Sequence, residues 1–249
     1  MSEPISPQKI MDFLRPRLGI RFKTWLSICT HCGLCADTCH FYLAHNRIPA
    51  MIPAYKVTFL QDLITKKGHV NATFMQQMYD VIYHECNMCR RCTMYCPFGI
   101  DIALLINLSR ALLFHLDIAP EGLMKAIQNY HESGNQMAVT DIDWVDTVEW
   151  CAEECQDELK DIKIPIDKVE MDYLYTINAR EAKFYPQDIQ EVAKIFHVAG
   201  ESWTLPSAKG WDDTNLSMFC GDTATSRMIV ENTFKRAEEL RVKKVAVTE

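Results

Sequence analysis

Eight of the eleven cysteines fall into two runs with identical spacing. Each run has the pattern C-x2-C-x2-C-x3-C, which holds four-iron clusters in bacterial proteins. The first three thiolates wrap one face of a [4Fe-4S] cubane, whereas the fourth ligates the other cluster when two are present. The spacing therefore predicts two [4Fe-4S] clusters with crossed ligands, cluster 1 on Cys29, Cys32, Cys35 and Cys96, and cluster 2 on Cys39, Cys86, Cys89 and Cys92.

Other chemistries of closely spaced cysteines fit these runs less well. A structural zinc site uses two C-x2-C pairs per tetrahedral ion and has no use for a third thiolate at that spacing. A thioredoxin-like redox site is a single C-x-x-C near a βαβ unit. Covalent haem needs C-x-x-C-H; His40 follows Cys39, but the preceding cysteine is four residues back.

Charged and titratable side chains lie within or beside both runs. Arg90 and Arg91 stand between ligands of cluster 2, and we expect their positive charge to favour the reduced cluster and raise its potential. His31 and His40 are expected to flank cluster 1. We interpret them as surface histidines without a ligand role, and coupling of reduction to protonation is the alternative.

Composition and charge narrow the environment and the partners. Residues 1–100 contain 11 Lys/Arg and 6 Asp/Glu, whereas residues 101–249 contain 15 and 27. Such blocks usually face different neighbours, although variation among solvated helix faces is an equal alternative. The formal net charge is −7 and no nucleic-acid motif occurs, so we expect no nucleic-acid partner.

The sequence favours a chain that is cytoplasmic, either soluble or peripheral on the cytoplasmic face of the membrane. The first seven residues lack the basic and apolar regions of a secretory signal. The most apolar stretch, residues 100–116, includes Asp101 and Arg110 and is not a membrane span. Thiolates reserved for iron also need a reducing compartment. The basic, amphipathic residues 6–26 either lie on a membrane or membrane subunit or, as favoured, pack on their own domain.

Helices must bring the two runs together, because 46 residues separate Cys39 from Cys86. Apolar spacings of 3 and 4, a break at Gly68 and an N-cap at Asn71 predict a helical hairpin. Further helices are predicted over 102–116, 120–134 and 140–159. The hairpin residues expected to face inward are Ile52, Tyr55, Phe59, Leu63, Phe74, Met78 and Ile82.

The rest of the chain predicts a parallel α/β layer. Strands are expected over 171–177, 203–205, 216–220 and 244–248, alternating with helices over 186–200 and 223–240. No G-x-G-x-x-G follows a strand, so nucleotide binding has no support. Cys151 and Cys155 lie one turn apart on an apolar helical stripe, too far for the usual disulfide, and we interpret them as buried structural thiols rather than extra ligands.

The cysteine runs on a helical scaffold resemble the iron–sulfur subunits of the heterodisulfide reductase superfamily, of the HdrC/HdrD and DsrK types. The tail is most similar to the DsrK type, on the residues 175–186, 199–204 and 219–222. The resemblance implies a mainly α fold: an alpha-helical ferredoxin domain with two [4Fe-4S] clusters over 1–135, and a helix plus a partial α/β domain over 136–249 that is part of a CCG-type catalytic region.

One departure from that family concerns its CCG repeats, which hold a further iron–sulfur site. Phe219 stands where the first cysteine of such a repeat would be. Cys220 is therefore expected to be a buried cysteine at the end of a strand, and a third iron–sulfur site would use it only with a partner or a downstream segment. Because the sequence stops directly after an expected strand, we expect either a fragment or a partner that supplies the catalytic half.

The resemblance implies an iron–sulfur electron-transfer subunit of a heterodisulfide reductase-like complex in sulfur metabolism, passing single electrons to or from a thiol/disulfide site. The implied partners are a catalytic CCG-type subunit, a membrane cytochrome b or a flavoprotein, and a thiol/disulfide carrier protein. No catalytic residue is assigned in this chain. The alternatives are the electron-transfer partner of a flavin dehydrogenase of the glycolate oxidase or glycerol-3-phosphate dehydrogenase type, and a non-redox scaffold in which metal only holds the fold.

Overall fold

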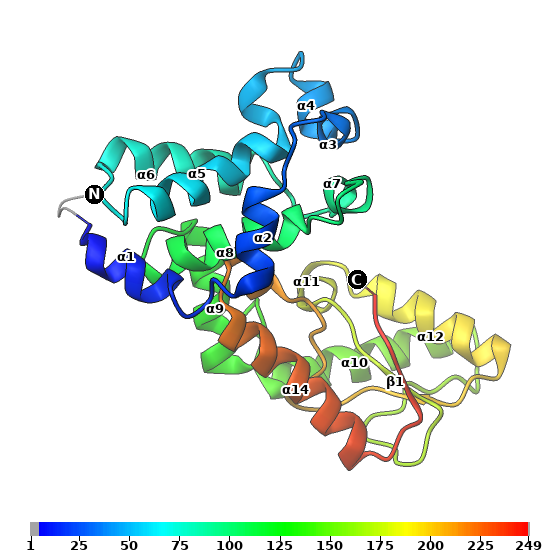
Figure 1. The fold of residues 1–249 in the computed structure, drawn as a ribbon. Coiled ribbons are helices and arrows are strands. Elements are labelled where there is room, and N and C mark those ends of the chain that lie inside the picture. The colour runs from blue at the N-terminus through cyan, green and yellow to red at the C-terminus, as the bar shows by residue number, and fades with distance from the viewer. Residues whose placement is uncertain (1–4, 249) are drawn as a thin grey trace. The chain divides into compact units, whose positions relative to one another are not determined.

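The computed structural model describes residues 5–248 and shows a mostly helical chain with one small parallel sheet (Figure 1). Two compact units form: the chain up to Pro120 with Phe219–Asp222, and Glu121–Met218 with the residues from Thr223 onward. Residues 219–222 thus return to the first unit. None of the helices within 5–248 is both long and apolar enough to cross a membrane.

The regular elements described in the first unit are helical and surround one central helix, α8 (Ile102–His115). Helix α8 contacts α1, α5, α7 and the π-helical turn η2. Asp101 caps it by accepting a hydrogen bond from the Leu104 N–H at 3.0 Å. The other elements are α1 (Pro7–Leu14), α2 (Ile20–Ser27), α3 (Leu34–Asp37), α4 (His40–Ala44), η1 (Pro49–Met51), α5 (Pro53–Thr65), α6 (Ala72–Tyr79), η2 (Asp80–His84) and α7 (Arg91–Met94).

Helices α5 and α6 form the predicted hairpin, and the side chain of Asn71 caps α6 as expected by accepting a hydrogen bond from the Phe74 N–H at 2.9 Å. The inner face of α5 differs from the prediction, since Tyr55 is 42% exposed. The apolar side chain of Tyr55 suggested that it lies on the buried face of α5. The buried face contains Lys56 instead, and a hydrophobicity pattern does not predict a buried lysine. The buried residues of α5 are Pro53, Lys56, Val57, Phe59, Leu60 and Leu63.

The second unit contains a parallel sheet, as the alternation of strands and helices predicts. The sheet has three strands in the order β2-β1-β3. Tyr175 of β1 packs with α10 and α12, whereas its neighbour Leu174 points to the opposite face, against Ala237 and Leu240 at the end of α14. The elements are α9 (Glu121–Ser133), α10 (Asp141–Gln156), β1 (Tyr173–Tyr175), α11 (Ala179–Phe184), α12 (Gln187–Ala199), β2 (Trp203–Thr204), α13 (Leu216–Cys220), α14 (Thr223–Glu239) and β3 (Lys244–Ala246).

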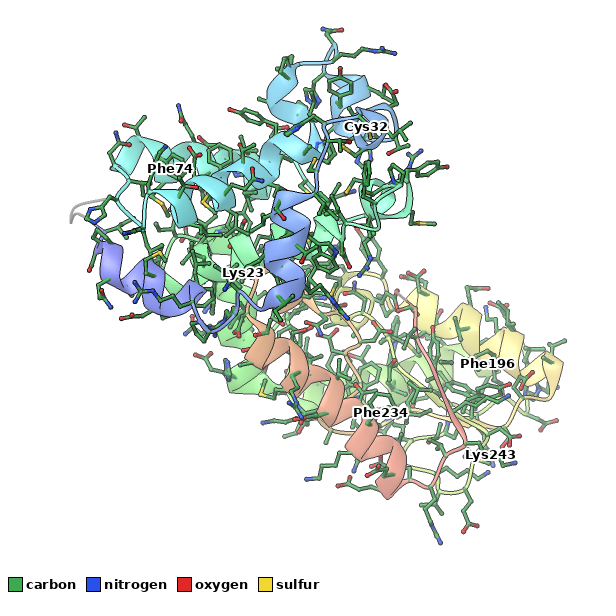
Figure 2. All side chains as sticks on the ribbon, viewed as in Figure 1. Lys23, Cys32, Phe74, Phe196, Phe234 and Lys243 are labelled. Atoms are coloured by element: carbon green, nitrogen blue, oxygen red, sulfur yellow. The ribbon has the colours of Figure 1, made fainter. Side chains whose placement is uncertain are left out.

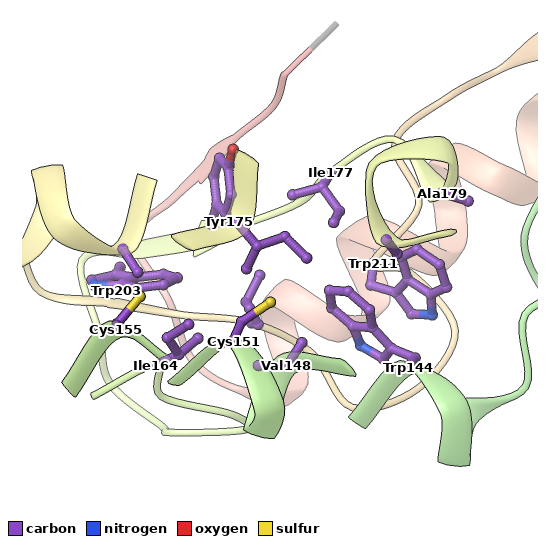
Figure 3. Packing of buried hydrophobic residues seen from close by; sticks show 14 of the residues in the cluster. Trp144, Val148, Cys151, Cys155, Ile164, Tyr175, Ile177, Ala179, Trp203 and Trp211 are labelled. Carbon is purple, nitrogen blue, oxygen red and sulfur yellow. The ribbon is translucent and has the colours of Figure 1, made fainter. Parts of the chain in front are cut away.

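Cys151 and Cys155 lie in the core of this unit as buried thiols, as predicted (Figure 3). The Cys151 thiol donates to the Pro186 carbonyl at 3.4 Å, and burial raises the pKa of Cys151 to about 11. Near the start of α10, Trp144 stacks on Trp211 with ring centroids 4.4 Å apart. The described residues of this core include none of the two cysteine runs.

The prediction of a strand over residues 216–220 is wrong, because these residues form helix α13. The Asn215 side chain accepts hydrogen bonds from the Met218 N–H at 3.3 Å and the Ser217 hydroxyl at 2.6 Å. Such local capping favours a helical turn, and five residues are too few for periodicity to separate strand from helix. Cys220 therefore lies at the end of a helix and not at the end of a strand, as was expected.

The segment 219–222 packs directly against helix α8 of the first unit. Tyr83 donates from its hydroxyl to the Cys220 carbonyl at 2.7 Å, and Arg110 donates to the Phe219 carbonyl at 2.8 Å. Gly221 has a φ of +95°, and a Cβ atom there would lie 2.4 Å from the Ala111 nitrogen. No side chain can be accommodated at this position.

Replacing Gly221 with alanine is therefore expected to lower the free energy of unfolding by about 2–4 kcal/mol, through backbone strain and overlap with α8. Gly122, in α9, is a matched control because an added Cβ would meet no atom within 4 Å. Gly122→Ala should be neutral or stabilising by up to about 1 kcal/mol. Denaturant unfolding of both variants checks this, and equal effects would show that the segment is not docked as described.

Candidate iron–sulfur centre

The two cysteine runs adopt the same backbone path. The residue before the second cysteine, His31 or Met88, has a φ of +56° or +63°, and the residue after it, Gly33 or Arg90, has a φ of +86° or +63°. Left-handed conformations cost about 1–3 kcal/mol at non-glycine residues and persist where the surroundings or function require them. In the second run the Met88 N–H donates to the Cys86 sulfur, with 3.4 Å between nitrogen and sulfur.

Each run contains a four-residue helix, α3 or α7, and these two helices contact one another. The contact brings the end of each run to the start of the other. As a result the first unit contains two hollows, each lined by three cysteines of one run and the last cysteine of the other. The first is lined by Cys29, Cys32, Cys35 and Cys96, and the second by Cys39, Cys86, Cys89 and Cys92, the same grouping as in the expected ligand sets.

The donor sets fit a cluster better than a single ion. Four thiolates around one zinc, at Zn–S distances of about 2.3 Å, lie about 3.8 Å from one another. Within residues 5–248, no group of three or more Cys, His, Asp or Glu side chains is placed to hold one metal ion. The cysteines instead surround a space, with Cys32 and Cys89 exposed and the others buried or half-buried. Figure 2 labels Cys32, which lies beside α3. This arrangement suits a larger group bound by thiolates alone.

Burial also affects the thiols that face the two hollows. Burial raises the pKa of Cys35 and raises that of Cys92 to about 12, and neighbouring cysteines of the same hollow add to both shifts. The raised pKa values favour the protonated thiols in both hollows. Binding of iron must therefore displace protons, which makes assembly of such a site favourable at higher pH.

Two buried cations next to the second hollow, Lys56 and Arg110, were not predicted from the sequence. Lys56 is 1% exposed, lines this hollow and donates from Nζ to the Glu85 carbonyl. Arg110 is 3% exposed and donates to the carbonyls of Ile82 and Cys86. The sequence feature that could have indicated their burial is a single basic residue on an otherwise apolar face, Lys56 in α5 and Arg110 in α8.

The charged residues that were predicted from the sequence lie at the surface. Arg90 pairs with Asp101 at 2.8 Å, and its side chain is 62% exposed. Arg91 is also exposed and, like Arg90, lines the second hollow. His31 lines the first hollow as expected, but the placement of His40 was wrong: it follows Cys39 and lines the second hollow.

Comparison with known proteins agrees with this centre. Residues 25–100 match the model of the 4Fe-4S dicluster domain. The chain is 26% identical over 132 residues to Hdr-like menaquinol oxidoreductase iron-sulfur subunit 2 of Archaeoglobus fulgidus, and 27% identical over 130 residues to the Hdr-like menaquinol oxidoreductase iron-sulfur subunit of Archaeoglobus profundus. In each case 47% of this chain and 23% of the relative are covered, so the chain matches about a quarter of the relatives' length.

The similarity thus extends to Hdr-like iron–sulfur subunits and does not distinguish the DsrK type from the others. No solved structure matches the chain significantly. The dicluster domain match spans both cysteine runs and the hairpin between them, which is the part of the chain that forms the two hollows.

Proposed function

We propose that this chain is an iron–sulfur electron-transfer subunit of an Hdr-like oxidoreductase complex, with two [4Fe-4S] clusters held by the crossed cysteine sets. The observation that carries the proposal is the presence of two hollows, each lined by three cysteines of one run and one of the other. When bound, such clusters supply one-electron redox chemistry. Crossed ligands keep two clusters close together, which suits a short relay between a donor and an acceptor.

The residues around the cysteines would orient the ligands, hydrogen-bond to their sulfur atoms and shield the clusters from water. The left-handed positions turn backbone N–H groups toward sulfur, which tunes reduction potential. Apolar side chains of α8 and the preceding loop, Ile100, Ile102 and Leu105, line the first hollow and limit access of water. Asp101 accepts hydrogen bonds from Thr93 and from the N-terminus of α8, so it fixes the second run to the central helix.

The ends of the relay are proposed to lie in other subunits. The two relatives are named as subunits of a menaquinol oxidoreductase, and this chain matches only 23% of each. We propose that it exchanges electrons with a quinol-oxidising membrane partner, such as a cytochrome b, and with a thiol/disulfide site of sulfur metabolism in a CCG-type subunit. We propose that the chain works on the cytoplasmic face of the membrane.

A redox titration tests the proposal. The anaerobically purified chain should take up about two electrons reversibly from small mediators, one per cluster, and should not turn over a disulfide by itself. Adding the partner subunits should produce turnover. Disulfide reduction by these 249 residues alone would contradict the assignment as a relay and would make Cys151, Cys155 and Cys220 candidate catalytic thiols.

A further inference from the structure

The two hollows differ in the charge that surrounds them. Of the residues that the structure describes, no Lys, Arg, Asp or Glu side chain lines the first. The second is lined by Lys56, Arg90, Arg91 and one acidic residue, Glu85. A cluster bound by four thiolates carries net negative charge and becomes more negative on reduction, so nearby positive charge stabilises the reduced state. The two sites are therefore electrostatically unequal.

A buried positive charge stabilises a nearby reduced cluster more strongly than an exposed one, because water and salt do not screen it. Arg90 and Arg91 are exposed, where water and salt screen them, and Arg90 is also neutralised by Asp101. Lys56 is 1% exposed. Its ammonium group thus acts through an interior of lower effective dielectric than water.

Lys56 and Arg110 donate hydrogen bonds to two adjacent backbone carbonyl groups, at and just before Cys86. Lys56 donates to the carbonyl of Glu85, and Arg110 donates to that of Cys86. Neither forms an ion pair with a carboxylate within residues 5–248. Buried cations are normally paired with an anion. A negatively charged cluster in the adjacent hollow is the counter-charge that fits.

We propose that Lys56, supported by Arg110, makes the cluster held by Cys39, Cys86, Cys89 and Cys92 the first of the two to be reduced. This inference rests on the proposed pair of clusters. It assigns Lys56 a tuning role that acts through charge and without ligation. In a chain that carries one electron, that electron resides on the cluster beside Lys56, and the cluster in the uncharged hollow has the lower potential.

An EPR-monitored titration of the full chain tests this proposal, with the two signals assigned by their response to Cys39→Ser and Cys96→Ser. Lys56→Met removes the charge and keeps an unbranched side chain of similar length. At a fixed ambient potential it should lower the reduced-to-oxidised ratio of the second cluster at least tenfold, equivalent to about 59 mV for one electron. The first cluster should respond less than threefold.

Arg91→Gln is the matched control, since it removes the same charge from the same hollow at an exposed position. It should change the ratio by less than threefold, and an effect equal to that of Lys56→Met would overturn the special role of the buried lysine. Should Lys56→Met fail to assemble, the order of reduction in the wild type decides: reduction of the first cluster before the second rejects the proposal. Absence of two reducible clusters in the wild type would instead reject the proposed function.

Discussion

Replacing Cys96 with serine is expected to remove or convert the cluster bound by Cys29, Cys32 and Cys35 and to leave the other cluster intact. Cys96 belongs to the second run, yet its side chain lines the first hollow. A serine oxygen is a poorer ligand for this iron than a thiolate, so one cubane should lose stability. Iron analysis should show a loss of up to about four iron atoms per chain, the content of one cubane.

Two further variants make this result specific. Cys39→Ser should give the mirror image, with damage to the cluster of Cys86, Cys89 and Cys92. Cys151→Ser removes a buried thiol that lies outside both hollows, and it should lower the stability of the second unit without loss of iron. If Cys96→Ser damages the cluster of its own run, the crossed assignment is wrong.

Removal of iron is expected to unfold the first unit and leave the second folded. Eight cysteines, together with buried Lys56 and Arg110, surround the two hollows or contact their ligands. Without clusters, both cations are buried without counter-charge and the hollows lack their contents. Structural metal binding contributes on the order of 10 kcal/mol to folding in small sites, comparable with the whole stability of a domain.

Amide hydrogen exchange of the apo protein separates the two units. Protection should be lost in α8 and in the hairpin α5–α6, whereas α10 should remain protected, because the stacked pair Trp144 and Trp211 and the rest of that core contain no expected ligand. A single calorimetric transition of unchanged midpoint after iron removal would contradict this. Loss of protection in α10 would show that the second unit depends on the clusters as well.

The features that could be predicted from the sequence are those with strict spacing. The two cysteine runs determined the expected ligand sets because the motif specifies which residues share a cluster. The helix predicted over 140–159 forms as α10 (Asp141–Gln156), because a long apolar stripe at helical spacing indicates one buried face. The positions of strands β1, β2 and β3 were also predicted, because short apolar segments alternate there with helical ones.

The features that could not be predicted depend on tertiary contacts. Burial of Lys56 and Arg110 follows from carbonyl groups presented by residues 82–86, which no local pattern reveals. Helix α13 results from capping by Asn215 and from the docking of Gly221 on α8, in a segment distant in sequence. His40 was placed at the wrong hollow because adjacency in sequence was given more weight than the crossing of the runs.

Quantification of iron and acid-labile sulfide in the anaerobically purified wild-type chain, together with Mössbauer spectra, tests the presence of two clusters most directly. We predict about eight iron and eight sulfide per chain, twice the content of one cubane, with spectra of [4Fe-4S] centres. About four of each would mean that only one hollow holds a cluster. Stoichiometric zinc without sulfide or visible charge-transfer absorption would contradict the electron-transfer function altogether.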